Sequence, residues 1–172
     1  MRRELTGRKV GQVVFHPTAS NLLTSASGDH LVRLWDIEKG QESAAVTLTG
    51  HKDSIQSLAW NPVGTLLATV SYLMSFDGLA DGQTCRDKKL RLFDPRAGTE
   101  AVRITDGHGG VKGSRVTWLG DRDRIATTGV SWVSPASGLA DGQFSRMSDR
   151  QVGLWDTAGL TNLDMTSVDS SA

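Results

Sequence analysis

Three stretches of this chain are nearly alike, and they decide its fold. They read Leu31-Val32-Arg33-Leu34-Trp35-Asp36, Lys89-Leu90-Arg91-Leu92-Phe93-Asp94 and Gln151-Val152-Gly153-Leu154-Trp155-Asp156. A further aspartate lies seven positions before the last residue of each stretch: Asp29, Asp87 and Asp149. Such recurrence along one chain is the signature of a repeat architecture, in which each copy forms one structural unit.

Two more elements recur upstream of these stretches. The first occupies residues 13–17, 57–62 and 115–119, and the second occupies residues 21–27, 66–69 and 124–128. The dipeptides Gly50-His51 and Gly107-His108 open the second and third copies. All of these runs are short and rich in β-forming residues, and Gly, Pro, Asn and Asp separate them. This pattern predicts an all-β fold of antiparallel strands.

The order of elements in each copy resembles the WD40 repeat, which implies four-stranded β-propeller blades. In that family a His, a Ser or Thr, an Asp and a Trp form a hydrogen-bonded set. The resemblance implies structural sets of His51, Thr69, Asp87 and Phe93, and of His108, Thr127 or Thr128, Asp149 and Trp155. The first copy offers Asp29 and Trp35 without a matching His. We expect an incomplete second set, because Phe93 has no indole N–H, and a complete third set.

The copies are more widely spaced than WD40 repeats of about 40–45 residues. Residues 70–83 and 130–143 explain the excess, because both stretches begin Val-Ser and end Gly-Leu-Ala-Asp-Gly-Gln. One hypothesis is that both are short retained introns, since Val-Ser and the closing Gln can be encoded by splice-donor and splice-acceptor sequences. Two alternatives stay open: a pair of genuine mobile loops on the blade rim, or a duplicated binding loop.

With these insertions set aside, residues 127–129 and 144–157 read T-T-G-F-S-R-M-S-D-R-Q-V-G-L-W-D-T. This stretch resembles the signature of the coronin family, and residues 10–21 and 84–99 are similar to other coronin segments. The resemblance covers roughly residues 10–168. It implies an incomplete portion of a seven-bladed propeller, with about three blades at residues 10–40, 50–98 and 107–157. Residues 158–172 are expected to be a polar tail, and the oligomerising coiled coil of the family is not seen in this sequence.

The same resemblance implies a function. Coronins bind filamentous actin and regulate the organisation of the actin cytoskeleton in the cytoplasm, without catalysis, and other cytoskeletal proteins are further expected partners. The alternative is a general WD40 scaffold for the assembly of protein complexes. Without the coiled coil, we expect these 172 residues alone to bind actin weakly or not at all, because multivalency is lost.

Composition excludes several other classes of protein. Lys and Arg number 19 and Asp and Glu number 19, so no broad basic field favours nucleic acid. The single cysteine, Cys85, cannot form an intrachain disulfide and suits a reducing compartment. No apolar run approaches the roughly 18 residues of a membrane span. Residues 107–114 are glycine-rich but lack the order of a phosphate-binding loop. The four histidines lack metal-ligand spacing, so we expect no metal or cofactor.

One group of cations is a candidate partner-binding site. Its members lie in and after two equivalent inter-strand turns and are Arg86, Lys88, Lys89, Arg91, Arg146 and Arg150. Adjacent blades would place both turns on the same propeller face, where a basic patch could hold the acidic actin filament. The alternative is that these are ordinary turn charges, some of them paired with Asp87 or Asp149.

Overall fold

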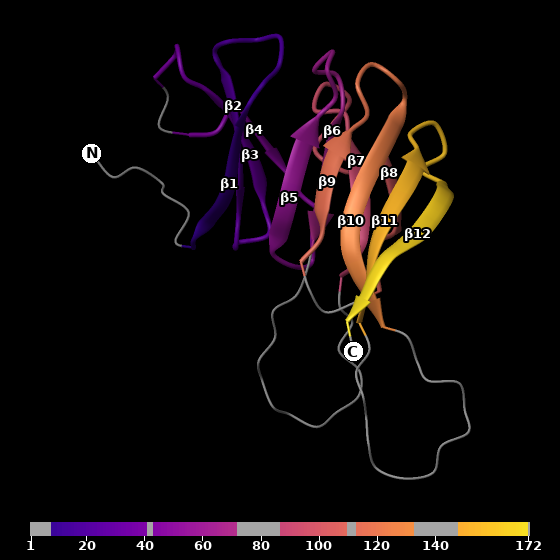
Figure 1. Cartoon of the computed structure of the whole chain (residues 1–172). Helices are drawn as coiled ribbons and strands as arrows, with labels where there is room; N and C mark the ends of the chain where they lie inside the picture. Colours follow the sequence, from indigo (N-terminus) through magenta and orange to yellow (C-terminus); the bar gives the residue numbers. More distant parts are fainter. Residues whose placement is uncertain (1–7, 41–42, 72–86, 110–112, 133–147, 172) are drawn as a thin grey trace.

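Every regular element that the structure describes is a β-strand. The computed structural model describes residues 8–40, 43–71, 87–109, 113–132 and 148–171. Their strands form three four-stranded antiparallel sheets, in orders β1-β2-β3-β4, β5-β6-β7-β8 and β9-β10-β11-β12 (Figure 1). Each sheet is a β-meander, in which neighbours in sequence are also neighbours in the sheet. The all-β propeller-blade prediction is confirmed.

The strand bounds follow the repeats. The first sheet contains β1 (Val10–Phe15), β2 (Leu22–Ser27), β3 (Val32–Asp36) and β4 (Val46–Leu48). The second contains β5 (Ile55–Trp60), β6 (Leu67–Ser71), β7 (Lys89–Phe93) and β8 (Arg103–Asp106). The third contains β9 (Arg115–Trp118), β10 (Arg124–Trp132), β11 (Ser148–Asp156) and β12 (Asn162–Ser171).

The expected blade boundaries each stop one strand too early. Residues 10–40, 50–98 and 107–157 leave out β4, β8 and β12, which complete the three sheets. The expected polar tail at residues 158–172 is therefore wrong over Asn162–Ser171, because that segment pairs with β11 along its length. A fourth strand lies on the outer edge of its sheet and contacts solvent, so it carries little apolar alternation for a sequence reading to detect.

The insertions also begin inside regular structure. Val70 and Ser71 end β6, and Val130 lies within β10, so the first residues of 70–83 and 130–143 continue strands instead of leaving the blade. Val70 is buried between the second and third sheets. Residues 72–83 and 133–143, which make up the rest of both stretches, lie outside the described residues.

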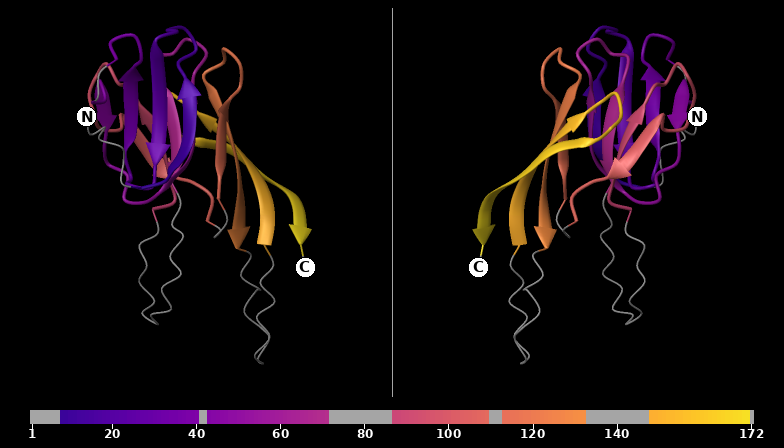
Figure 2. Two further views of the ribbon diagram at one scale, coloured as in Figure 1. Left: turned by 90° about the vertical axis from the view of Figure 1, so that its left-hand side faces the viewer. Right: turned by 90° about the vertical axis from the view of Figure 1, so that its right-hand side faces the viewer.

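The three sheets pack side by side, with their first strands adjacent (Figures 1 and 2). Strand β5 packs against both β1 and β9, so the second sheet is covered on both faces. Because successive side chains of a β-strand point to opposite faces, each strand of the second sheet contributes side chains to both interfaces. On β6, Leu67 faces the first sheet and Ala68 faces the third; on β7, Phe93 and Leu92 divide in the same way. All residues of β6 are buried in consequence.

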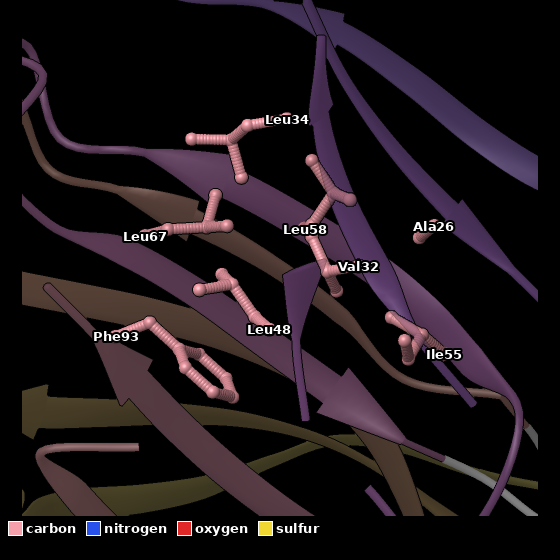
Figure 3. Packing of buried hydrophobic residues seen from close by; sticks show 8 residues of the cluster. All are labelled: Ala26, Val32, Leu34, Leu48, Ile55, Leu58, Leu67 and Phe93. Atoms are coloured by element: carbon pink, nitrogen blue, oxygen red, sulfur yellow. The ribbon is translucent and has the colours of Figure 1, made fainter. Parts of the chain in front are cut away.

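Two apolar clusters hold the sheets together. The first lies between the first and second sheets and consists of Ala26, Val32, Leu34, Leu48, Ile55, Leu58, Leu67 and Phe93 (Figure 3). The second lies between the second and third sheets and consists of Ala68, Val70, Leu90, Leu92, Val116, Ile125, Trp155 and Leu160. Burial of these side chains is the main favourable contribution to packing one blade on the next.

Hydrogen bonds fix the register between blades. The Gln12 side chain accepts from the backbone N–H of Leu58 at 2.9 Å and donates to its carbonyl at 3.2 Å. The Trp60 indole Nε1 donates to Thr24 Oγ1 at 3.0 Å. These bonds join the first sheet to the second. Because they bind backbone groups and one hydroxyl at fixed positions, they disfavour any slip of one blade along the other.

The second and third sheets are joined in a similar manner. Trp118 Nε1 donates to the carbonyl of Ala59 at 2.9 Å, and Arg115 Nη1 donates to the carbonyl of Gln56 at 2.9 Å. Tryptophan serves this position well because its ring packs on the neighbouring sheet while its N–H reaches a polar partner.

His16 makes a further link between blades that sequence reasoning missed. Its Nε2 lies 2.8 Å from the carbonyl oxygen of Gly64, and its ring packs edge-on against Trp60 with centroids 4.6 Å apart. Gly64 has φ of 77°, a conformation that favours glycine, and a Cβ there would overlap the His16 ring. Glycine at this position therefore serves both the turn and the inter-blade contact.

Candidate functional site

A buried ion pair lies at the centre of the polar set in the second sheet. Arg91 Nη2 donates to both carboxylate oxygens of Asp87, at 3.0 and 2.8 Å, and both side chains are 4% exposed. Asp87 Oδ2 also accepts the backbone N–H of Lys52 at 2.9 Å. Arg91 Nη1 donates to Ser71 Oγ at 3.1 Å. The pair therefore ties the end of β6, the start of β7 and the loop that enters the blade.

The other members of this set lie beside the ion pair. His51 Nε2 and Thr69 Oγ1 share a hydrogen bond of 3.3 Å, and the His51 ring packs against Phe93 with centroids 5.4 Å apart. The structure thus brings His51, Thr69 and Asp87 together, as the WD40 resemblance implies. Phe93 fills the tryptophan position with a ring that packs but cannot donate to Thr69.

The first sheet holds a smaller version of the same arrangement. Arg33 Nη1 lies 2.7 Å from Asp29 Oδ2, and Ser27 Oγ donates to the other carboxylate oxygen. Trp35 Nε1 donates to Ser25 Oγ at 2.8 Å. Because Asp29 and Arg33 are about one-fifth exposed, this pair is better hydrated than the pair in the second sheet.

The third sheet departs from the expected complete set. Trp155 Nε1 donates to Thr127 Oγ1 at 2.7 Å, and Thr127 Oγ1 lies 2.9 Å from His108 Nε2, which selects Thr127 over Thr128. A hydroxyl that accepts from the indole remains able to donate to a neutral imidazole. These three residues form a buried chain of hydrogen bonds.

Asp149 does not join that chain, so the expectation of a complete third set is wrong. In the described contacts its carboxylate accepts from Ser167 Oγ at 3.5 Å, on the neighbouring strand β12. Strands β10 and β11 pair continuously as far as Trp132 and Ser148, which places Asp149 within a ladder instead of a tight turn. Arg33 and Arg91 lie four residues after the equivalent aspartates of the other two sheets, but the residue four positions after Asp149 is Gly153. The third blade thus lacks the aspartate–arginine pair of the other two.

Burial and charge set the protonation of these groups. Burial and, to a smaller extent, the Arg91 guanidinium lower the pKa of His51 to about 3, although the nearby Asp87 carboxylate acts in the opposite direction. Burial also lowers the pKa of His108, against opposing hydrogen bonds from Gln151 and Thr127. For Asp87, burial raises the pKa, but hydrogen bonds from Lys52 and Arg91 outweigh it and leave the pKa below its ordinary value. At neutral pH the set therefore contains a neutral imidazole beside an ionised pair.

This arrangement predicts a loss of stability in mild acid. Below pH 6.5 the unfolded chain protonates His51, whereas the folded chain does so only near pH 3. The contribution of His51 to the free energy of unfolding should therefore fall by about 1 kcal/mol between pH 6.5 and 5.5, and by about 1.4 kcal/mol for each further pH unit toward the folded pKa. Urea unfolding at pH 7.5, 6.5 and 5.5 measures this slope. Asp29 and Asp87 lose their contributions only at lower pH, because their pKa values are below the ordinary 3.8.

The His51→Gln variant is the control for this prediction. Between pH 6.5 and 5.5 it should lose about 1 kcal/mol less than the unaltered chain, while the part due to His108 remains. Equal slopes in the two proteins would show that His51 titrates normally in the folded state.

The candidate basic patch is only partly present. Arg91 is buried in its pair with Asp87, so the prediction that it contacts a partner is wrong. Lys89 Nζ lies 2.5 Å from Asp106 Oδ1, and Lys88 Nζ donates to the carbonyl of Gly109. Arg150 is exposed on β11. Arg86 and Arg146 lie outside the described residues.

The described residues offer little space for a small molecule. A cavity of about 10 Å³ lies between the second and third sheets, beside Ser71, Lys88, His108 and Thr127. It is about the size of one water molecule. In the part of the chain that the structure describes, no cluster of three or more His, Cys, Asp or Glu side chains could hold a metal ion. The same residues include no helix that is long and apolar enough to cross a bilayer.

Comparison with known proteins agrees with this geometry. The family model "WD domain, G-beta repeat" matches residues 2–36 and 43–94, which include seven of the first eight strands. The third sheet lies outside that match but has the same topology as the other two. The chain is similar to the WD40 domain of Toxoplasma gondii coronin, with a TM-score of 0.69 and 24% identity over 95% of this chain and 35% of that one.

Relatives found by sequence comparison indicate which group of WD40 proteins this chain is similar to. The chain is 41% identical over 160 residues to "Coronin-like protein crn1" of Schizosaccharomyces pombe, and 39% identical over 165 residues to "Coronin-like protein" of Saccharomyces cerevisiae. These alignments cover 92% and 94% of this chain but 21% and 20% of the relatives. The chain thus spans about a fifth of their length. With its repeated blades and their polar sets, this chain belongs to the WD40 family and, within it, to the coronin group.

Proposed function

We propose that this chain contributes a non-catalytic, actin-filament-binding surface to the organisation of the cytoplasmic actin cytoskeleton. Its membership of the coronin group supports this role. The observation that carries the proposal is the uneven charge at one end of the blades. We define the Asp-turn end as the end at which β2, β4, β6 and β8 finish and β3, β5, β7 and β9 begin, which is the lower end in Figure 1.

The aspartates at the Asp-turn end are buried or paired with cations. Asp53 is 2% exposed, and Asp87 is buried against Arg91. Asp106 is exposed and paired with Lys89. The cations, in contrast, reach solvent: Lys52 and Arg115 are exposed, and Lys88 and Lys89 are half-buried. A surface whose carboxylates are buried or paired presents a positive potential even when the net charge of the chain is zero.

The opposite end of the blades has no such separation of charge. Its exposed cations include Lys39, Arg96 and Arg122, and exposed Glu38, Asp121 and Asp123 lie on the same turns or the neighbouring ones. Interspersed charges of both signs cancel within roughly one Debye length of about 8 Å at physiological ionic strength. We therefore assign the filament contact to the Asp-turn end.

Attraction between this surface and an acidic filament would be sensitive to salt and weak for a single copy. We expect half-saturation of filaments above roughly 10 µM protein at low salt. Binding of this strength becomes useful when several copies act on one filament, because each further contact is then intramolecular.

Co-sedimentation with actin filaments tests the proposal. The triple variant Lys52→Glu, Lys88→Glu, Lys89→Glu should remove the chain from the filament pellet. The matched variant Lys39→Glu, Arg96→Glu, Arg122→Glu changes the net charge by the same amount at the opposite end, and it should still sediment with filaments. Raising the salt from 50 to 200 mM should release the unaltered chain.

Two outcomes would contradict the proposal. Equal loss in both triple variants would mean that net charge alone controls sedimentation, and the Asp-turn end would not be the contact. No sedimentation of the unaltered chain at 50 mM salt and about 50 µM protein would remove actin as a direct partner of these residues and would favour the general scaffold.

A further inference from the structure

A histidine side chain closes the turn between β1 and β2. His16 Nδ1 accepts the backbone N–H of Thr18 at 3.3 Å and that of Ala19 at 3.1 Å. A ring nitrogen accepts only when it carries no hydrogen, so the ring is neutral and its hydrogen is on Nε2. That N–H donates to the carbonyl oxygen of Gly64, 2.8 Å away in the next sheet. The contacts of His16 therefore determine both its tautomer and its charge.

In the second sheet, the same position holds a side chain that does not titrate. Asn61 follows β5 as His16 follows β1, and each donates its backbone N–H across the turn, to the carbonyl oxygens of Leu66 and Leu22. Asn61 Oδ1 accepts the N–H groups of Thr65 and Leu66 at 2.8 and 2.9 Å. An amide oxygen accepts at every pH, whereas imidazole is the side chain whose charge ordinarily changes between pH 5 and 8. The first turn thus uses a pH-sensitive acceptor where the second turn does not.

The ring of His16 lies among uncharged groups. Residues 17–21 of its own turn and residues 61–66 of the facing turn include no charged side chain. The carboxylate bonded to this turn is that of Asp36, which accepts from Asn21 Nδ2 at 3.2 Å. Hydrogen bonding, and not an adjacent ion, therefore governs which form of the ring fits the turn.

An acceptor for a second ring proton is already in place. Thr18 Oγ1 lies 3.4 Å from His16 Nδ1 and itself donates to the carbonyl oxygen of Val63 at 3.3 Å. A hydroxyl that donates its hydrogen elsewhere keeps lone pairs with which to accept. A protonated Nδ1 can therefore donate to Thr18 Oγ1, but it can no longer accept the N–H groups of Thr18 and Ala19.

The contact with the second sheet is compatible with both forms of the ring. Nε2 carries a hydrogen in either form, and a charged donor makes the stronger bond to the carbonyl oxygen of Gly64. The ring also packs edge-on against Trp60, with centroids 4.6 Å apart. A proton from solvent thus changes what the ring binds in its own turn, while its bond to the next blade persists.

We propose that His16 is a proton-operated switch of the β1–β2 turn. The neutral ring closes the turn by accepting the N–H groups of Thr18 and Ala19. In the protonated ring Nδ1 donates to Thr18 Oγ1, and the two N–H groups turn to solvent. The switch lies at the end of the blades opposite the Asp-turn end, where residues 17, 18 and 20 are exposed, and it does not depend on actin binding. Two hydrogen-bonded arrangements of one turn, selected by a single proton, are the elements that such a switch needs.

NMR spectroscopy of the unaltered 172-residue chain between pH 7.5 and 5.0 tests the proposal. At pH 7.5 the ring should carry hydrogen on Nε2 alone, and at the acid end on both nitrogens. The amide signals of Thr18 and Ala19 should shift with the same midpoint as the ring nitrogens. The nuclear Overhauser contact between the ring and Gly64 should be present throughout. The amides bound by Asn61, those of residues 65 and 66, are the internal control and should stay in place.

Three variants separate the two states. His16→Asn supplies the same acceptor as Asn61, so the amides of Thr18 and Ala19 should no longer shift in this pH range. Thr18→Val keeps the shape of an exposed side chain but removes the acceptor for the protonated ring. Its midpoint should be lower by roughly half a pH unit or more, because a hydrogen bond from a charged donor is lost. Ser20→Ala, in the same turn, should leave the midpoint unchanged.

Several results would each overturn the proposal. One is a hydrogen on Nδ1 at pH 7.5, and another is a ring that stays neutral down to pH 5.0. A third is a ring that titrates while the amides of Thr18 and Ala19 stay fixed. Loss of the contact with Gly64 in acid would mean that the ring leaves the second blade, so that a joint opens and not a turn. An unchanged midpoint in Thr18→Val would remove the hydroxyl as the acceptor.

Discussion

Replacing Asp87 with asparagine should cost about 3 to 5 kcal/mol of unfolding free energy, because it leaves the Arg91 guanidinium buried without a counter-charge. Both side chains are 4% exposed, so water cannot take the place of the carboxylate. A loss of this size is a large fraction of the 5–15 kcal/mol typical of a folded domain. Urea unfolding at pH 7.5 gives the difference, with the slope of the transition reported alongside the midpoint.

The chain supplies its own control for this substitution. Asp29→Asn removes the equivalent carboxylate from the first sheet, where the ion pair with Arg33 is about one-fifth exposed. This change should cost only about 1 kcal/mol. The double variant Asp87→Asn, Arg91→Met should recover much of the loss, because no unpaired charge stays buried. Similar costs for Asp87→Asn and Asp29→Asn would show that burial does not govern the two pairs.

Truncating Phe93 to alanine should cost about 3 to 5 kcal/mol, through loss of buried apolar surface and creation of a cavity. Phe93 is completely buried on the second sheet, in the cluster that faces the first (Figure 3). Its ring also packs on His51. The change therefore weakens both the joint between two blades and the polar set next to it. Thermal unfolding by calorimetry measures the loss.

The matched variant for Phe93→Ala is Ile104→Ala. Ile104 lies on β8 of the same sheet and is 54% exposed, so its truncation should cost less than about 0.5 kcal/mol. If the two variants lost similar stability, the packing between the first and second sheets would not be the source of the effect of Phe93.

The repeat pattern predicts the fold well because three strands of each blade carry strong signals. Buried strands such as Leu67–Ser71 and Lys89–Phe93 need apolar residues, and in the first two sheets an aspartate before the third strand pairs with an arginine of that strand. The fourth strands escaped detection for a physical reason. Strand β4 has only three residues, which is too short to show an alternating pattern even though Leu48 is buried. Strand β12 faces solvent along most of its length, so burial hardly constrains its sequence.

The polar sites were harder to predict, because position along a strand does not reveal what covers it. Arg91 alternates with Leu90 and Leu92, a pattern that normally places a charge in solvent. In a blade with neighbours on both sides, the second face is covered as well, so the arginine needs Asp87 as a buried partner. The four-residue interval between Asp87 and Arg91, repeated between Asp29 and Arg33, is the sequence signal that could have identified the pair.

His16 shows another limit of reasoning from one sequence. It precedes a proline, where the repeat pattern indicates only a turn, and its partner Gly64 is 48 residues away in the next blade. The contact exists because the corresponding turns of adjacent blades lie side by side. Only the relative placement of the blades determines it, and no local pattern encodes that placement.

The stacking of the sheets in chain order has a consequence for how motion spreads through the molecule. Each sheet packs against its neighbour along the chain, so the middle sheet belongs to both interfaces while each outer sheet belongs to one. Such a stack behaves as a short one-dimensional lattice with nearest-neighbour coupling. Either outer blade can open while the remaining two stay folded, so the amides of β6 and β7 should be the last to exchange with deuterated solvent. A disturbance in one outer blade then reaches the other only by first loosening the middle one.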